Sequence, residues 1–228
     1  IHCFAGGDPA ILDGGYDDME EFWSDLTDAY RKEIAALVAA GARYIQIHDV
    51  SLPFLCDDDY AGVFQSWGSS PAKMLEEYAR RINDVLAGAP DDVTFTMHTC
   101  RGNREGLWAA EGGYDPVADV LFNQINVTGY FMEYDTPRAG TFEPLRLLPE
   151  GKVVALGIMS SKAPVIEDAE ALKRRIDEAA QFAPLERLAV APQCGFASSI
   201  VGNPLTEDVE KAKLARLVGV ANDVWGAA

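Results

Sequence analysis

The sequence contains few basic residues for its length. Lysine and arginine together number 19, against 36 aspartate and glutamate residues, and the formal net charge at pH 7 is −17. Proteins that bind nucleic acid without regard to sequence need a dense cationic face, and so do proteins that dock on anionic lipid. The excess of acidic residues therefore argues against both kinds of partner.

Long apolar runs and cysteine pairs are missing as well. No run approaches the roughly 20 apolar residues of a membrane-spanning helix, and no basic-then-apolar leader opens the chain, so export has no positive support. The four cysteines are too few for a disulfide scaffold, and no C-x-x-C pair occurs. We expect a cytoplasmic protein with reduced thiols, in which a functional cysteine is a metal ligand or a nucleophile.

The sequence does have the composition of a folded globular domain, with 48% hydrophobic and 24% charged residues. Residues 1–228 are long enough to form a single domain with a sizeable core. Apolar residues at helical spacing predict helices over 17–40, 71–87, 115–124, 165–181 and 206–225. Runs rich in β-branched and aromatic residues predict strands over 43–49, 92–100, 127–135, 153–161 and 188–194.

The first of these helix and strand pairs carries specific expectations. Tyr30, Ile34 and Leu37 lie on the apolar face of the helix over 17–40. Gly41 follows where a left-handed C-terminal cap belongs. The segment 43–49 is predicted to be a short buried strand.

Alternation of apolar strands with amphipathic helices predicts a parallel sheet covered by helices. Two α/β architectures fit, an open doubly wound sheet or a (β/α)₈ TIM barrel, and no glycine-rich nucleotide motif opens a helix. Barrel enzymes assemble their active sites at the carboxyl ends of strands. The polar residues gather at these ends: His48, Asp49, His98, Cys100, Glu133, Asp135, Ser160, Ser161, Lys162 and Cys194. Because five units cannot close eight strands, either strands are missing upstream of Ile1 or the barrel assignment is wrong.

A metal site is the sharpest functional prediction. Residues i and i+2 of a strand point to one face, so His98 and Cys100 can converge on one point. Cys194 follows a later strand at the matching end, and Glu133 ends the intervening one. One imidazole and two thiolates suit Zn²⁺, with the carboxylate as a fourth ligand. A buried thiol beside a hydrogen-bonded histidine is the alternative for the H-x-C tripeptide alone.

The charges of these ligands indicate what such an ion would do. Two thiolates and a neutral imidazole balance a dication, so an added substrate thiolate would make the complex anionic. A coordinated thiol is deprotonated at neutral pH and keeps its electron density. The site therefore favours activation of a thiol nucleophile over polarisation of a carbonyl. A labile Glu133, displaced when the thiol binds, would supply the open position of a catalytic site.

Four segments resemble the cobalamin-independent methionine synthase family, and in particular its short, single-barrel members. They are MHTCRGN (97–103), GYFMEYDTPRAGTFEPLR (129–146), ALGIMSSK (155–162) and APQCGFASS (191–199). The resemblance implies a (β/α)₈ barrel in which zinc binds the homocysteine thiolate for methyl transfer from a methylated folate. It places the zinc ligands at His98, Cys100, Glu133 and Cys194. It also implies that residues 1–228 hold the last five β/α units of the barrel.

Two departures from the family affect the substrate. Long members have Asp-Glu where this chain has His48-Asp49, and they carry a proton-donating histidine where it has Lys162. We expect Asp49 and Lys162 to position substrate, with His48 and Glu133 also in contact with it; a surface lysine is the alternative for Lys162. Arg101 could pair with a substrate carboxylate, as could Arg104 and Arg138, although surface arginines are common.

Alternative functions therefore stay open. An epoxide-opening alkyltransferase that uses a small thiol such as coenzyme M would fit the loss of an acid at His48. A barrel decarboxylase of the uroporphyrinogen type would need no metal and would have an arginine-rich cleft. A zinc-storing protein or scaffold would have a closed four-ligand site. The expected partners are a small-molecule thiol acceptor and an alkyl or methyl donor, and a homo-oligomer is left open.

Overall fold

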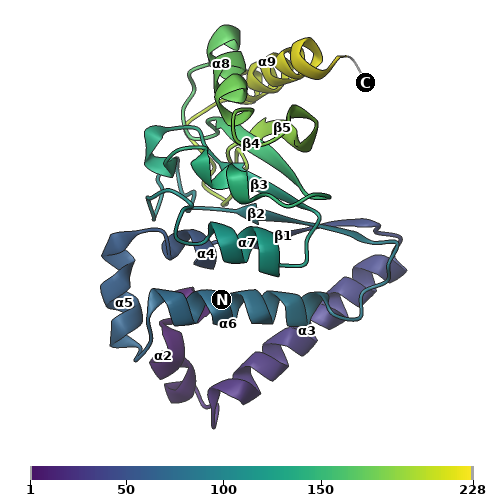
Figure 1. The fold of residues 1–228 in the computed structure, drawn as a ribbon. Coiled ribbons are helices and arrows are strands. Elements are labelled where there is room, and N and C mark those ends of the chain that lie inside the picture. The colour runs from purple at the N-terminus through teal and green to yellow at the C-terminus, as the bar shows by residue number, and fades with distance from the viewer. Residues whose placement is uncertain (1, 227–228) are drawn as a thin grey trace.

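A parallel sheet of five strands forms the centre of the computed structural model, which describes residues 2–226 (Figure 1). Neighbouring strands pair in parallel, and their spatial order is the order of the chain. The strands are β1 (Tyr44–Asp49), β2 (Thr94–Thr99), β3 (Gly129–Glu133), β4 (Val153–Met159) and β5 (Leu188–Pro192). The predicted α/β class, with its parallel sheet, is confirmed.

Helices connect the strands and cover the sheet. The α-helices are α1 (His2–Ala5), α2 (Gly7–Asp13), α3 (Met19–Ala39), α4 (Ser51–Phe54), α5 (Ala61–Ser66), α6 (Pro71–Leu86), α7 (Ala118–Gln124), α8 (Ala169–Ala179) and α9 (Glu207–Trp225). Four 3₁₀ turns are η1 (Asp58–Tyr60), η2 (Pro137–Ala139), η3 (Glu143–Leu147) and η4 (Leu185–Arg187). Within residues 2–226, no helix is both long and apolar enough to cross a bilayer.

Side-chain caps fix where the long helices begin. Asp18, Ser70, Asp168 and Thr206 each accept a hydrogen bond from the backbone N–H three residues later, which satisfies a donor that the first turn leaves free. Gly41 follows α3 with φ of 105°, the left-handed conformation expected for it. The short helices α1, α2, α4 and α5 were not predicted, because one or two turns are too short to show helical periodicity.

The helices gather at the two ends of the sheet. Helix α8 packs on β4 and α9 packs on β5, and the two helices also contact each other (Figure 1). At the other end, α6 packs against α3 and α7. Between these groups, Tyr130, Met132 and Leu156 share one face of the sheet and are fully inaccessible to solvent. The other face carries Phe131, which is half-buried.

Strand β1 differs from the prediction of a buried strand. Its residues alternate between exposed and half-buried, and Tyr44 is 55% exposed. The strand is exposed because, in the described residues, β1 lies at the edge of the sheet and pairs only with β2. Tyr30 and Leu37, predicted on the apolar face of α3, are exposed as well. They line a groove of about 370 Å³ between α3, β1 and α6, together with Ile45 and other apolar residues.

Strand register brings the polar strand ends to one edge. Thr99 of β2 is level with Met132 of β3, and Glu133 is level with Gly157 of β4. Gly157 is level in turn with Ala191 of β5. Residues that follow β2 and β5, such as Cys100 and Cys194, therefore leave the sheet close to Glu133.

Candidate metal centre

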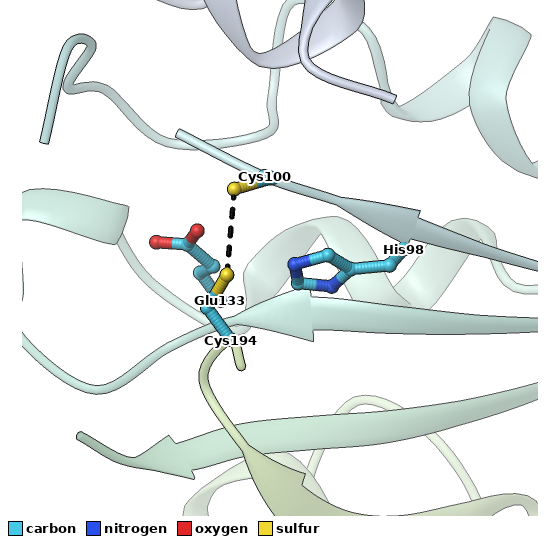
Figure 2. A group of neighbouring side chains, drawn as sticks. All are labelled: His98, Cys100, Glu133 and Cys194. Atoms are coloured by element: carbon cyan, nitrogen blue, oxygen red, sulfur yellow. Dashed lines mark hydrogen bonds between the residues drawn. The ribbon is translucent and has the colours of Figure 1, made fainter. Parts of the chain in front are cut away.

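Four potential metal ligands meet at the carboxyl edge of the sheet. One ligand atom each from His98, Cys100, Glu133 and Cys194 lies within 4.8 Å of the other three (Figure 2). All four residues are buried. The structure thus brings together the four residues that the sequence proposes as ligands, although they lie in or just after three different strands and are up to 96 residues apart, as His98 and Cys194 are.

The imidazole of His98 is held in the orientation of a metal ligand. Its Nδ1 atom lies 3.0 Å from the carbonyl oxygen of Phe131. A carbonyl can only accept, so Nδ1 carries a proton, and in the neutral ring Nε2 presents a lone pair. Nε2 is buried and has no hydrogen-bond partner among the described residues. A buried polar atom without a partner is rare, and a metal ion would satisfy it.

The two sulfur atoms lie 3.6 Å apart, joined by a hydrogen bond (Figure 2). A disulfide would need about 2.05 Å, whereas two thiolates at about 2.3 Å from a tetrahedral ion lie about 3.8 Å from each other. The hydrogen bond from Cys100 lowers the pKa of Cys194 despite its burial. The same bond, together with burial, raises the pKa of Cys100. Cys194 is therefore the thiolate of the pair, and Cys100 keeps the proton.

The Glu133 carboxylate is fully buried and accepts three hydrogen bonds. Oε1 accepts from the backbone N–H of Arg101 at 2.9 Å. Oε2 accepts from Nε2 of Gln193 at 2.9 Å and from Nη1 of Arg138 at 3.3 Å. Arg138 also pairs with Asp135 at 2.9 Å, so its charge is shared between two acids. These donors match a carboxylate, which can only accept.

A cleft of about 450 Å³ opens beside His98 and Cys194. His48 lines it, level with His98 in the register of β1 and β2, and the two rings meet edge to face at 4.8 Å between centroids. Desolvation in the cleft, and then the neighbouring His98, lower the pKa of His48 below its ordinary value. His48 is therefore a neutral side chain at neutral pH. Among the described residues, no aspartate, glutamate or arginine lines this cleft.

The other predicted substrate residues lie outside the cleft. The Asp49 carboxylate accepts from the backbone N–H of Leu52 in α4 at 2.8 Å, on the opposite face of β1 from His48. Lys162 is buried rather than at the surface, and its Nζ donates to the carbonyl of Gly102 at 2.8 Å. The lysine thereby holds the loop that follows Cys100. The substrate-positioning roles of Asp49 and Lys162 stay predictions.

The structure corrects the expectation that Arg101 is a surface residue. It is fully buried, and its guanidinium donates to the Tyr114 hydroxyl at 2.7 Å and to the carbonyl of Gly112 at 2.6 Å. The side chain thus secures the loop behind the site and also donates to the backbone carbonyl of Glu133 at 3.4 Å. The Glu133 carboxylate itself accepts from the backbone N–H of Arg101. Sequence reasoning missed Gln193, which directly contacts Glu133. The only signal was its place next to Cys194 in the APQCGF segment.

Comparison with known proteins shows a family for most of the chain. Residues 5–222 match the family model described as the catalytic domain of cobalamin-independent synthase. The protein YxjH of Bacillus subtilis (strain 168), described as uncharacterized, is 45% identical over 213 residues, which are 93% of this chain and 56% of YxjH. A methionine synthase of Pyrococcus horikoshii is 24% identical over 204 residues, which are 88% of this chain and 52% of that protein.

The chain is also similar to a solved structure. A protein of Listeria monocytogenes, provisionally named a vitamin-B12 independent methionine synthase, superposes with a TM-score of 0.72 at 37% identity. The match covers 92% of this chain and 57% of the Listeria chain. The chain therefore spans little more than half the length of the relatives that it matches.

Proposed function

Because the chain belongs to the cobalamin-independent methionine synthase family, we propose that it carries the zinc-dependent site for methyl transfer from a methylated folate to the homocysteine thiol. The observation that carries the proposal is the buried set of one imidazole, two thiols and one carboxylate within 4.8 Å. Nitrogen and sulfur donors in such a set favour zinc over harder cations. The unpartnered Nε2 of His98 supports the same assignment.

In this proposal His98, Cys100 and Cys194 hold the ion throughout the reaction, and Glu133 holds it only when the acceptor thiol is absent. Zinc, when bound, would favour loss of the proton from the acceptor thiol, and the resulting thiolate is the nucleophile. The chain contributes two thiolates that already balance the charge of a dication, a set that favours thiol activation. Phe131 contributes the carbonyl that keeps His98 in the correct tautomer.

The cleft beside His98 and Cys194 gives the acceptor its place. Cys194 lines the cleft, so a thiol that enters there reaches the ligand set directly. His48 offers a neutral imidazole at the same position. Lys162, which lies outside the cleft, holds the loop after Cys100 by donating to the carbonyl of Gly102. The backbone N–H of Arg101 orients the Glu133 carboxylate by donating a hydrogen bond to it.

We further propose that the five β/α units belong to a (β/α)₈ barrel of the methionine synthase type, whose other strands lie upstream of this chain. Parallel strands in chain order, with the ligands at their carboxyl ends, support this architecture. The exposed edge of β1 and the apolar groove beside α3 support it too. A crystal structure of the full-length protein tests it, and a sheet that stays open at β1 would contradict it.

One observation favours a second candidate function. No acidic residue lines the described part of the cleft, although the ammonium group of homocysteine would need a carboxylate or carbonyl partner. Alkyl transfer to a thiol without an amino group, as in epoxide opening by a small thiol, fits such a lining. A metal-free decarboxylase is not favoured, because its cleft would need arginine.

The deciding experiment measures metal and product together. The full-length protein, purified without chelators, should contain about one zinc per chain by elemental analysis. Incubation with isotopically labelled methyltetrahydrofolate and homocysteine should yield labelled methionine. Parallel reactions with an epoxide and a small thiol distinguish the second candidate. Protein that is metal-free after gentle purification, and inactive when zinc is added, would exclude both candidates.

A further inference from the structure

Gln193 joins Glu133 to the loop that follows β4. Its side chain is fully buried, with Nε2 donating to Oε2 of Glu133 at 2.9 Å. Its Oε1 accepts from the backbone N–H of Ser161 at 3.3 Å and from the Ser161 hydroxyl at 3.2 Å. A carboxylate can only accept and an N–H can only donate, so the orientation of the amide is fixed from both sides. Gln193 therefore has one arrangement in which all its contacts are satisfied.

This contact crosses strand β4 at a residue without a side chain. Glu133 belongs to β3 and Gln193 follows β5, with Gly157 of β4 between them. A Cβ atom on Gly157 would lie 2.9 Å from Cα of Gln193, 2.6 Å from the carbonyl oxygen of Met132 and 3.4 Å from Cα of Glu133. Any larger residue at this position would push the backbones apart. Gly157 thus permits the close approach that the amide and the carboxylate need.

Hydrogen bonds already occupy most of the Glu133 carboxylate. A carboxylate has about four lone-pair sites, and three of them receive donors from Arg101, Gln193 and Arg138. One site remains for an ion, so Glu133 can be only a single-atom ligand in this arrangement. Of the two side-chain donors, Gln193 makes the shorter bond, and Arg138 shares its charge with Asp135.

We propose that Gln193 is a positioning residue for Glu133. Its hydrogen bond weakens Glu133 as a metal ligand, and it holds the Glu133 carboxylate in position when the acceptor thiol replaces that carboxylate on the ion. The inference rests on the proposed thiol transfer and names the residue that makes the ligand exchange easy. Loss of the Gln193 donor frees Oε2 for the ion. Glu133 then competes better with the thiol, so thiol affinity falls while metal affinity does not.

The test uses the full-length protein loaded with Co²⁺, whose visible absorption reports the sulfur ligands. Gln193→Met keeps the length of the side chain but removes the donor. We expect Gln193→Met to bind Co²⁺ at least as tightly as the wild type in competition with a chelator. We expect its titration midpoint with homocysteine, and with 2-mercaptoethanol, to rise about tenfold, as for loss of a hydrogen bond to a charged group.

Two further variants keep the test decisive. Gln193→Asn retains an amide that is too short to reach Oε2, so it should raise the thiol midpoint even if Gln193→Met fails to fold. Ser161→Ala removes one contact to Gln193 but leaves the donor to Glu133, so its midpoint should stay close to that of the wild type. An unchanged midpoint in both Gln193 variants would overturn the proposal, as would a parallel loss of Co²⁺ affinity or an equal shift in Ser161→Ala.

Failure of the proposed function gives a different result. If wild-type protein takes up no Co²⁺, or if neither thiol changes its spectrum, the thiol-activation site itself is wrong whatever the variants do. If the wild type responds and the Gln193 variants match it, only the role of Gln193 is wrong.

Discussion

The Nδ1 atom of His98 and the carbonyl oxygen of Phe131 lie 3.0 Å apart, on neighbouring strands of the sheet. The hydrogen bond between them decides which nitrogen faces the two sulfur atoms, because a carbonyl must receive the proton. The backbone of β3 thus sets the tautomer of a side chain on β2. A ligand oriented in this way requires no rearrangement before it binds an ion.

Removal of one sulfur ligand should abolish tight metal binding. We expect Cys194→Ser to lower zinc affinity by at least about a hundredfold, since a hydroxyl is a poor substitute for a thiolate. Elemental analysis after dialysis, together with chelator competition, measures the change. Cys56→Ala is the matched control, because Cys56 is buried near α4 and contacts the carbonyl of Leu52 instead. Equal zinc content in both variants would remove Cys194 from the ligand set.

Metal affinity should rise with pH. The hydrogen bond to Cys194 and burial raise the pKa of Cys100, so this thiol holds a proton that an ion must displace. Cys194 has a lowered pKa and has already lost its proton. Burial acts to lower the pKa of His98, but the neighbouring Cys194 raises it overall, so this imidazole is a second source of protons. At least one proton should therefore be released per ion, and affinity should increase at least about tenfold per pH unit across the neutral range. Proton release in weakly buffered solution checks this, and binding without proton release would contradict it.

The thiols should differ sharply in reactivity once metal is removed. Cys194 is the thiolate and lines the cleft, so iodoacetamide should label it first. Burial raises the pKa of Cys56 to about 12, so this thiol should stay unlabelled at neutral pH. Peptide mapping by mass spectrometry separates the two sites. Protection of Cys194 on adding back zinc is the further expected result, and faster labelling of Cys56 would be incompatible with these environments.

Replacement of Arg101 should destabilise the fold. Arg101→Met removes one donor from the Tyr114 hydroxyl and leaves the Gly112 carbonyl without its side-chain donor in a buried setting. We expect the free energy of unfolding to fall by about 3 kcal/mol, measured by denaturant titration. Arg146→Met is the control, since Arg146 is half exposed and its ion pair with Glu143 contributes less than about 1 kcal/mol. Similar losses in both variants would mean that the buried contacts of Arg101 contribute little.

Lys162 should matter for turnover but not for metal content. Lys162→Met removes the donor to the Gly102 carbonyl and loosens the loop after Cys100. We expect methyl transfer to fall at least about tenfold with zinc still at about one per chain. Lys173→Met, which changes a lysine in surface ion pairs, serves as control. Full activity in Lys162→Met would show that the lysine has no part in the reaction.

The grouping of the four potential ligands could be predicted because it follows from the topology of the sheet. His98 and Cys100 share a strand face by spacing, and Glu133 and Cys194 follow from the rule that parallel strands end at one edge. Gln193 and Arg101 depend instead on which way a side chain turns after its strand ends. That direction is set by distant partners such as Ser161 and Tyr114.

The exposed edge of β1 could not be predicted for a related reason. The strand has the apolar residues of a buried element, and Ile45 and Ile47 fit that pattern. Burial, however, depends on a neighbour on each side, and the described structure supplies only β2. Local sequence encodes the capacity to be buried, whereas the number of paired strands decides whether burial is achieved.

The spacing of the ligands along the chain also links metal supply to folding. Cys100 and Cys194 are 94 residues apart, and both need an assembled sheet before their sulfur atoms approach each other. An unfolded chain therefore offers no equivalent site, and an ion that binds only the native state adds its binding free energy to stability. With the zinc site that we propose, the thermal midpoint of this protein would rise with zinc concentration, and chelating buffers would lower it.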